Sequence, residues 1–191
     1  SAAVLLMTGC KDSQKDCDIS TTPFKPLLSG RDHTSEGFLA PLENGNILLL
    51  FRVDPGIEGD HVGMNGHIAQ IPYNPKTDQW GEVKTVYNSH QYDDRNVHGG
   101  VTKEGRIVIF FRKYDGEETV ARYFLYSDDN GQTWSEPQKS EAWSDPEDSG
   151  FRGVWSTGQM FYIPGKEQYA MLGCRRYITY SGDGTSWEEY N

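Results

Sequence analysis

Cysteine, long apolar segments and positive charge are all scarce in this 191-residue chain. The cysteines are Cys10, Cys17 and Cys174, and their spacing fits no metal-binding pattern. No segment approaches the ~20 consecutive apolar residues that a membrane-spanning helix needs. Lysine and arginine total 18 against 28 acidic residues, which gives a formal net charge of −10. Because nucleic-acid binders usually carry a basic face, this balance argues against a nucleic-acid partner.

Aromatic residues and glycine are abundant instead. The chain has 5 Trp, 11 Tyr, 8 Phe and 21 Gly. Such a composition, with little leucine or alanine, favours short strands and tight turns over helices. We therefore expect an all-β fold.

The sequence repeats itself along its length. Each repeat has a strand, a turn containing glycine and a strongly apolar strand, and the turn glycines Gly45, Gly105 and Gly165 are spaced by 60 residues. A third strand follows in each repeat and leads to a tryptophan, either Trp80, Trp134 or Trp187. Four short strands in a repeat of ~40–50 residues are the signature of a β-propeller blade, and these repeats are slightly longer.

Two of the repeats carry a specific polar turn before the tryptophan. The second reads SDDNGQTW from Ser127 to Trp134, and the third reads SGDGTSW from Ser181 to Trp187, one residue shorter. In such a turn the aspartate accepts hydrogen bonds from backbone amides, glycine supplies an unusual backbone angle, and tryptophan packs between sheets. The predicted turn residues are Ser127, Asp129, Gly131, Thr133, Trp134, Ser181, Asp183, Gly184 and Trp187.

These turns in register with the repeat resemble the Asp-boxes, or BNR repeats, of sialidase-like β-propellers. The resemblance implies antiparallel four-stranded blades, about three of which are present, and sialidases of this kind have six. We therefore expect residues 21–191 to form half of a six-bladed propeller. Either a longer polypeptide or a second copy would close the ring. In that family the boxes lie on the outer hairpins, so they identify the fold and not the activity.

The first 20 residues have a different character. The run SAAVLLMTGC resembles the end of a bacterial lipoprotein signal, in which Cys10 carries the lipid, and the following polar residues resemble a tether. An ordinary buried strand ending at Cys10 is the alternative. The lipoprotein interpretation predicts attachment to a membrane at the bacterial cell envelope, or an extracellular location. An exported protein permits a disulfide between Cys17 and Cys174, which stays a hypothesis.

In propellers, active sites lie where the inner strands begin and their connecting loops converge. Arg31, Arg95 and Arg152 each precede the inner strand of a repeat. Three converging guanidinium groups would bind a carboxylate, and the resemblance implies that of sialic acid. His98 is a further candidate for contact with the substrate. The alternative is that the arginines form salt bridges with Asp32, Asp94 and Asp148.

Asp60 is the candidate general acid. It follows the second strand of the first repeat, where sialidases place an acid/base aspartate, and Gly63 comes after it. The alternative is an exposed loop carboxylate. Two features depart from the family: Ser35–Phe38 replaces the usual Arg-Ile-Pro, and no tyrosine has the context of the nucleophile.

The sequence therefore leaves three functions open. The first is a sialidase-clan glycoside hydrolase acting on terminal sugars, an exo-glycosidase if the full propeller is present. The second is a carbohydrate-binding propeller without catalysis, and the third is a protein-interaction propeller. We expect a glycan or glycoconjugate as partner, with the missing half of the ring as a second candidate partner, and neither a cofactor nor a metal.

Overall fold

The computed structural model describes residues 26–28, 30, 32–55, 63–140, 158–172 and 178–187. The chain divides into two compact units, Ser1–Gly30 and Arg31–Asn191, and all the strands belong to the second. The described residues contain twelve strands and no helix, and every strand pairing is antiparallel. The expected all-β fold is therefore confirmed for this part of the chain.

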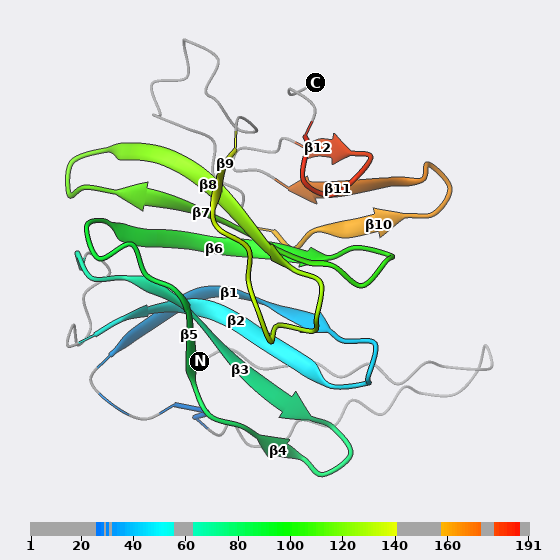
Figure 1. The fold of residues 1–191 in the computed structure, drawn as a ribbon, viewed down its shortest axis with the longest axis horizontal. Helices are drawn as coiled ribbons and strands as arrows, with labels where there is room; N and C mark the ends of the chain where they lie inside the picture. Colours follow the sequence, from blue (N-terminus) through cyan, green and yellow to red (C-terminus); the bar gives the residue numbers. More distant parts are fainter. Residues whose placement is uncertain are drawn as a thin grey trace, which may run out of the picture. The chain divides into compact units, whose positions relative to one another are not determined.

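The strands form three sheets that follow one another in the sequence (Figure 1). The first contains β1 (His33–Pro41), β2 (Ile47–Asp54), β3 (His67–Asn74), β4 (Gln79–Trp80) and β5 (Lys84–Tyr87). The second contains β6 (Asp93–Val101), β7 (Ile107–Tyr114), β8 (Thr119–Ser127) and β9 (Gln138–Lys139). The third contains β10 (Phe161–Ile163), β11 (Gln168–Leu172) and β12 (Ile178–Ser181). Within the described residues the second sheet has the four strands expected of each repeat, whereas the first has five and the third has three.

Glycine makes the first turn of the first two sheets possible. Gly45 and Gly105 have φ angles of 84° and 86° in the turns before β2 and β7. L-residues with a side chain rarely adopt this left-handed region, so glycine is the residue that fits there. The 60-residue distance between these two glycines in the sequence therefore reflects two hairpins of the same design.

The second sheet is buried on both faces. Ile107, Ile109 and Phe111 of β7 pack with Leu48 and Leu50 of β2 in one core. The alternate residues of β7 pack with the third sheet in another core, which comprises Val108, Phe110, Met160, Tyr169 and Met171. Because successive side chains of a strand point to opposite faces, β7 reads as an unbroken apolar run.

The two predicted polar turns have nearly the same hydrogen bonds. Oδ1 of Asp129 accepts from the amides of Gln132 and Thr133 at 3.0 and 2.9 Å. Asp183 does the same for Thr185 and Ser186, each at 2.7 Å. Hydrogen bonds from the Thr133 hydroxyl and amide lower the pKa of Asp129 to about 2. Burial raises the pKa of Asp183, but hydrogen bonds led by the Ser186 amide outweigh it and lower the value to about 2.

The tryptophans after these turns belong to different cores. Trp134 packs against the core between the first two sheets, and its Nε1 donates to Oε1 of Gln70 on β3 at 3.1 Å. Trp187 packs edge-on against Phe110, in the core shared with the third sheet. Trp80, which follows no such turn, is 41% exposed and lies against Tyr73. A separate tryptophan for each sheet is what the repeat predicted.

Candidate functional site

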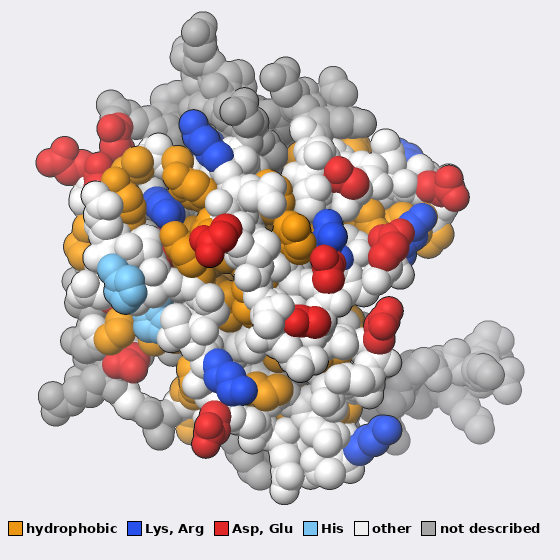
Figure 2. Space-filling view, in the orientation of Figure 1, with side chains coloured by type: hydrophobic (Ala, Val, Ile, Leu, Met, Phe, Trp, Pro, Cys, Tyr) orange, Lys and Arg blue, Asp and Glu red, His pale blue; other side chains and the backbone are white. Residues whose placement is uncertain are grey.

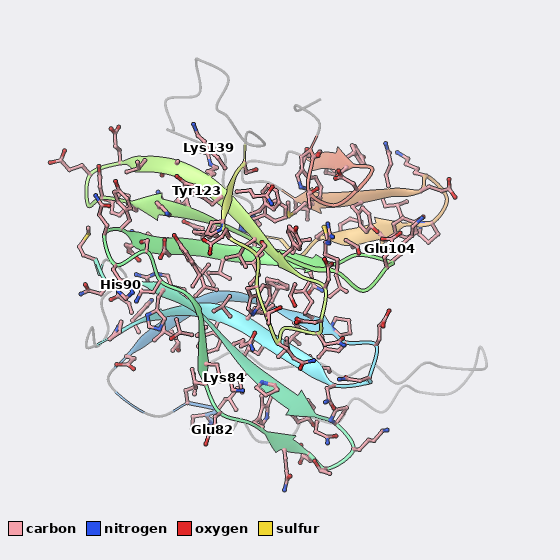
Figure 3. The ribbon with its side chains drawn as sticks, viewed as in Figure 1. Glu82, Lys84, His90, Glu104, Tyr123 and Lys139 are labelled. Carbon is pink, nitrogen blue, oxygen red and sulfur yellow. The ribbon has the colours of Figure 1, made fainter. Side chains whose placement is uncertain are left out.

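Charged and polar side chains gather at one end of the first two sheets. This is the end at which β6 begins and where β2 and β7 finish. In Figure 3, His90 lies at this end of the second sheet, whereas Glu104 lies on the turn at the opposite end. We call the cluster of Glu36, Arg52, Asp54, Asp93, Arg95, Asn96, Arg112 and Tyr114 the strand-end site.

Arg52 on β2 is a fully buried charge of the strand-end site. Its Nε and Nη2 donate to Oδ1 of Asp93 at 3.0 and 2.8 Å, and Nη2 also reaches Asp93 Oδ2 and Asp54 Oδ2 at 2.9 and 2.6 Å. All three side chains are fully buried. Burial raises the pKa of Asp93, although the hydrogen bonds and charge of Arg52 oppose the rise. The group links β2 of the first sheet to β6 of the second.

Two glycines cover this ion cluster closely. A Cβ atom on Gly66 would overlap Asp93 Oδ1 and come within 2.8 Å of Arg52 Nη2. A Cβ on Gly63 would overlap the carboxylate of Asp54. Residues 63–66 can therefore approach the cluster only because both positions lack a side chain.

Arg95 and Arg112 both lie against one aromatic ring. Their guanidinium carbons are 5.0 and 5.1 Å from the centroid of Tyr114, within the range of a cation–π contact. Nε of Arg95 is 3.4 Å from Asp93 Oδ2. Burial, followed by the charge of Arg95, lowers the pKa of Arg112 to about 10, so the Arg112 guanidinium stays charged at neutral pH.

Asn96 holds this arrangement at a β-bulge. The register of β6 against β7 shifts between Arg95 and His98, and Asn96 has a φ of 55°. Its amide N and Nδ2 donate to Glu36 Oε2 and Oε1 at 2.5 and 3.1 Å, and its Oδ1 accepts from Nε of Arg112 at 2.5 Å. Arg112 also donates to the hydroxyl of Thr119. Glu36, itself at φ 48°, is the bulged residue of β1, so the two bulges meet.

His98 is buried beside this bulge. Its ring stacks on Phe110, and Nδ1 is 2.6 Å from the carbonyl oxygen of Asn96. Burial lowers the pKa of His98 to about 4, so the imidazole is neutral at pH 7. Since the carbonyl can only accept, Nδ1 carries the proton and Nε2 presents a lone pair.

Asp94 points to the opposite face from its neighbours. It accepts a hydrogen bond from the Ser89 amide at 2.8 Å, and burial raises its pKa to about 6. Lys113, its cross-strand partner, donates to the Tyr87 hydroxyl and lies over the ring of Tyr123. The sequence alternative that paired Arg95 with Asp94 is not observed, because Arg95 shares its face with Asp93.

Several buried polar atoms at this end have no hydrogen-bond partner among the described residues. They are Arg52 Nη1, Asp54 Oδ1, His67 Nδ1, Asp94 Oδ1 and His98 Nε2. Buried polar groups are normally satisfied, so such a concentration marks a place suited to polar ligands.

Arg95 and His98 are the two predicted substrate-contact residues that the structure describes, and both lie at this end. Arg31, Asp60, Arg152 and the three cysteines lie outside the described residues, so their predicted convergence and pairing stay predictions. Sequence reasoning missed Arg52, Arg112 and Asn96. The signal was present, since Arg52 and Arg112 end the apolar strands of two repeats and are 60 residues apart, like the turn glycines.

Two further findings concern the described residues. No group of three or more histidine, cysteine or acidic side chains there is placed to hold a metal ion. No helix in the same part of the chain is long and apolar enough to cross a membrane.

No protein-family model matches the sequence, and no curated protein matches it either. Solved structures do resemble the fold. A protein of unknown function from Dyadobacter fermentans has a TM-score of 0.66 at 16% sequence identity, and the match covers 84% of this chain and 54% of that protein. A Hadza microbial sialidase has a TM-score of 0.61 at 16% sequence identity, and the match covers 81% of this chain and 36% of that sialidase.

A third similar structure is the Trypanosoma rangeli sialidase in complex with 2,3-difluorosialic acid as a covalent intermediate. Its TM-score is 0.58 at 15% sequence identity, and the match covers 90% of this chain and 30% of that sialidase. The fold of this chain is sialidase-like. The chain spans about half or less of the length of these structures.

Proposed function

We propose that this chain forms part of a sialidase-clan propeller that binds the terminal acidic sugar of a glycan. One observation carries the proposal: Arg95 and Arg112 are held together against Tyr114 at the strand-end site of a sialidase-like fold. Two guanidinium groups fixed side by side match the planar geometry of a carboxylate. The strand-end site is therefore assigned to the acidic group of the sugar.

The wider architecture that we propose is half of a six-bladed propeller, with the three sheets as blades and the two polar turns as Asp-boxes. The partial coverage of the similar structures supports this. So does the third sheet, where Phe161, Leu172 and Ile178 share one face and are 39–48% exposed. Apolar area of this kind suits a further blade. We propose that residues 21–191 belong to this propeller.

We propose that residues 1–20 are a lipoprotein tether attached through Cys10 at the bacterial cell envelope. The support is the sequence alone, namely the apolar run that ends in Cys10 and the polar residues after it. Labelling with a radioactive fatty acid, compared between the native protein and Cys10→Ser, tests this attachment.

Hydrolysis of the glycan, with Asp60 as general acid, is the further step of the proposal. Asp60 is three residues before Gly63, which packs against Asp54. Asp60 itself lies outside the described residues, and its role rests on its place in the sequence between β2 and Gly63. Arg31 and Arg152 would complete the carboxylate site.

Binding of a glycan without catalysis is the second candidate. It is favoured because the carboxylates that the structure describes at the strand-end site already have partners. Asp54 and Asp93 contact Arg52, and Glu36 accepts from Asn96. The described residues therefore supply binding groups, and the hydrolytic proposal depends on Asp60, which lies outside them.

Calorimetric titration of the full-length protein with sialic acid and with galactose tests the proposal. We expect sialic acid to bind and galactose to bind far more weakly. Arg95→Ala and Arg112→Ala should each weaken sialic acid binding at least about tenfold, the value of a charged hydrogen bond. Equal binding of both sugars, unaffected by either change, would exclude the carboxylate site.

Release of 4-methylumbelliferone from its sialoside separates the enzyme from the binding protein. If the native protein hydrolyses the sialoside, Asp60→Asn should abolish the reaction and leave sialic acid binding intact, because only the proton donor is removed. A native protein that binds sialic acid without any hydrolysis identifies the non-catalytic alternative.

A further inference from the structure

Three arginines lie side by side across the second sheet. Arg95 on β6 is the cross-strand partner of Arg112 on β7, and Arg112 is the partner of Arg122 on β8. Directly paired residues of antiparallel strands share one face. With neighbouring strands ~4.8 Å apart, this arginine row spans roughly 10 Å.

The row has an electrostatic cost. Like charges directly opposite one another in a sheet are destabilising. The effect is visible within the row, because the charge of Arg95 contributes to the lowered pKa of Arg112. It extends to the next cross-strand position, where Arg122 contributes to the lowered pKa of His98. An arrangement that weakens the fold in this way is typical of a binding site.

The solvent exposure of the arginines increases along the row from β6 to β8. Arg95 and Arg112 are 5% and 9% exposed, whereas Arg122 is only half-buried. Asp93 and Asn96 fix the first two, as described above. The row therefore has a rigid inner part and a more accessible outer end.

A hydrogen-bond acceptor accompanies these donors. His98 lies on the same face as Arg112, because its cross-strand partner is Phe110, two residues earlier on β7. It is 9% exposed, and its Nε2 has no hydrogen-bond partner among the described residues. Arginine can only donate, so this lone pair adds the acceptor that a sugar hydroxyl requires.

We propose that the arginine row binds an acidic oligosaccharide through two of its anionic groups, one between Arg95 and Arg112 and the second between Arg112 and Arg122. The inference rests on the proposed function and extends it from one terminal acidic sugar to a ligand with acidic groups on neighbouring units. Each arginine presents a planar fork of donors, which suits carboxylate or sulfate groups.

A nucleic-acid ligand fits the chain less well, although phosphate would suit the same donors. The net charge is −10, and Figure 2 shows acidic and basic side chains interspersed on the face that it presents. Binding to nucleic acid usually requires a broad basic surface. The arginines proposed to bind the ligand are confined to one row across the second sheet.

The test compares three sugars that differ in their number of carboxylates: neutral galactobiose, galacturonate and digalacturonate. Their affinities for the full-length protein are measured by calorimetry at low ionic strength. We expect digalacturonate to bind at least about tenfold more tightly than galacturonate, and galactobiose not to bind. Arg122→Gln should weaken digalacturonate binding about tenfold and leave galacturonate binding within about twofold.

Arg106→Gln is the matched control. Arg106 immediately precedes β7, at the opposite end of the second sheet, and pairs with Asp128 at the surface. It should change none of the affinities. Thermal melting of both variants establishes that they are folded, which the partial exposure of both side chains favours.

Each contrary result has its own meaning. One result would overturn the second anionic position and leave the proposed function standing. In that case galacturonate binds and its affinity falls in Arg95→Ala, but digalacturonate binds no more tightly than galacturonate and Arg122→Gln does not change its affinity. If neither galacturonate, digalacturonate nor sialic acid binds, both proposals fail. Galactobiose binding as tightly as digalacturonate also overturns the inference.

Discussion

Arg52 donates two hydrogen bonds to a single oxygen of Asp93, Oδ1, with Nε at 3.0 Å and Nη2 at 2.8 Å. The two residues are 41 positions apart and belong to successive sheets. Both side chains are fully buried, so the ion pair fixes how the start of β6 sits on the end of β2. Arg95, which the proposed function needs, takes its place from the other oxygen of the same carboxylate.

Replacing Asp93 should therefore strongly destabilise the protein. Asp93→Asn leaves the buried guanidinium of Arg52 without its main counter-charge, and losing one partner of a buried ion pair costs about 3–5 kcal/mol. Asp128→Asn is the control, since it removes the surface partner of Arg106 and should cost at most about 1 kcal/mol. Urea unfolding measures both, and equal losses would contradict a structural role for Arg52–Asp93.

The glycines that cover the ion cluster should not tolerate alanine. Gly66→Ala places a methyl group against Asp93 and Arg52, and because both side chains are held by the ion pair we expect a loss of about 1–3 kcal/mol. Gly165→Ala is the matched control, because a Cβ there meets no atom within 4 Å. Its free energy of unfolding should change by less than about 0.5 kcal/mol. A similar cost at both positions would show that the cluster rearranges freely.

Acid should weaken the two polar turns. Asp129 and Asp183 each have a folded-state pKa of about 2, below the ordinary value of 3.8. A lowered carboxyl pKa stabilises the fold above the unfolded-state pKa, and that contribution disappears as the pH falls from about 4 to about 2. Melting temperatures should fall over this window.

The double variant Asp129→Asn, Asp183→Asn identifies the source of that slope. It should melt lower than the native protein at pH 7 and show a shallower decrease below pH 4, because it has lost the titrating groups. An unchanged slope would assign the acid sensitivity to other carboxylates.

Local pattern predicted much of this fold. The recurrent glycines, the apolar strands and the polar turns gave the hairpins, and Trp134 and Trp187 occupy separate cores as the repeat required. The residues of one turn are adjacent in the sequence, so their hydrogen bonds follow from spacing alone. Strand number was less predictable, because β5 pairs with β3 through a bulged register and gives the first sheet a fifth strand.

The strand-end site was predicted only in part. Arg95 was placed in a loop, but it lies within β6, and strand alternation then gives it Asp93 and not Asp94 as its neighbour. Arg52 and Arg112 end apolar strands, where a charge suggests a solvated end, yet both are buried. Their partners lie on other strands, and pairing across strands depends on how bulges shift the register.

The bulge at Asn96 supplies the last prediction, which separates side-chain contacts from backbone strain. Asn96 has a φ of 55°, and its side chain contacts both Glu36 and Arg112. Asn96→Gly removes those contacts but keeps a residue that adopts this angle readily, whereas Asn96→Ala removes the contacts and adds strain of roughly 1–2 kcal/mol. Both variants should be less stable than the native protein, and alanine should be the worse by about 1 kcal/mol in urea unfolding. Because Arg112 loses its orienting hydrogen bond in each, both should also bind sialic acid more weakly than the native protein. Equal stability of the two variants would mean that the bulge relaxes, and unchanged sialic acid affinity in both would mean that Thr119 and Tyr114 suffice to hold Arg112.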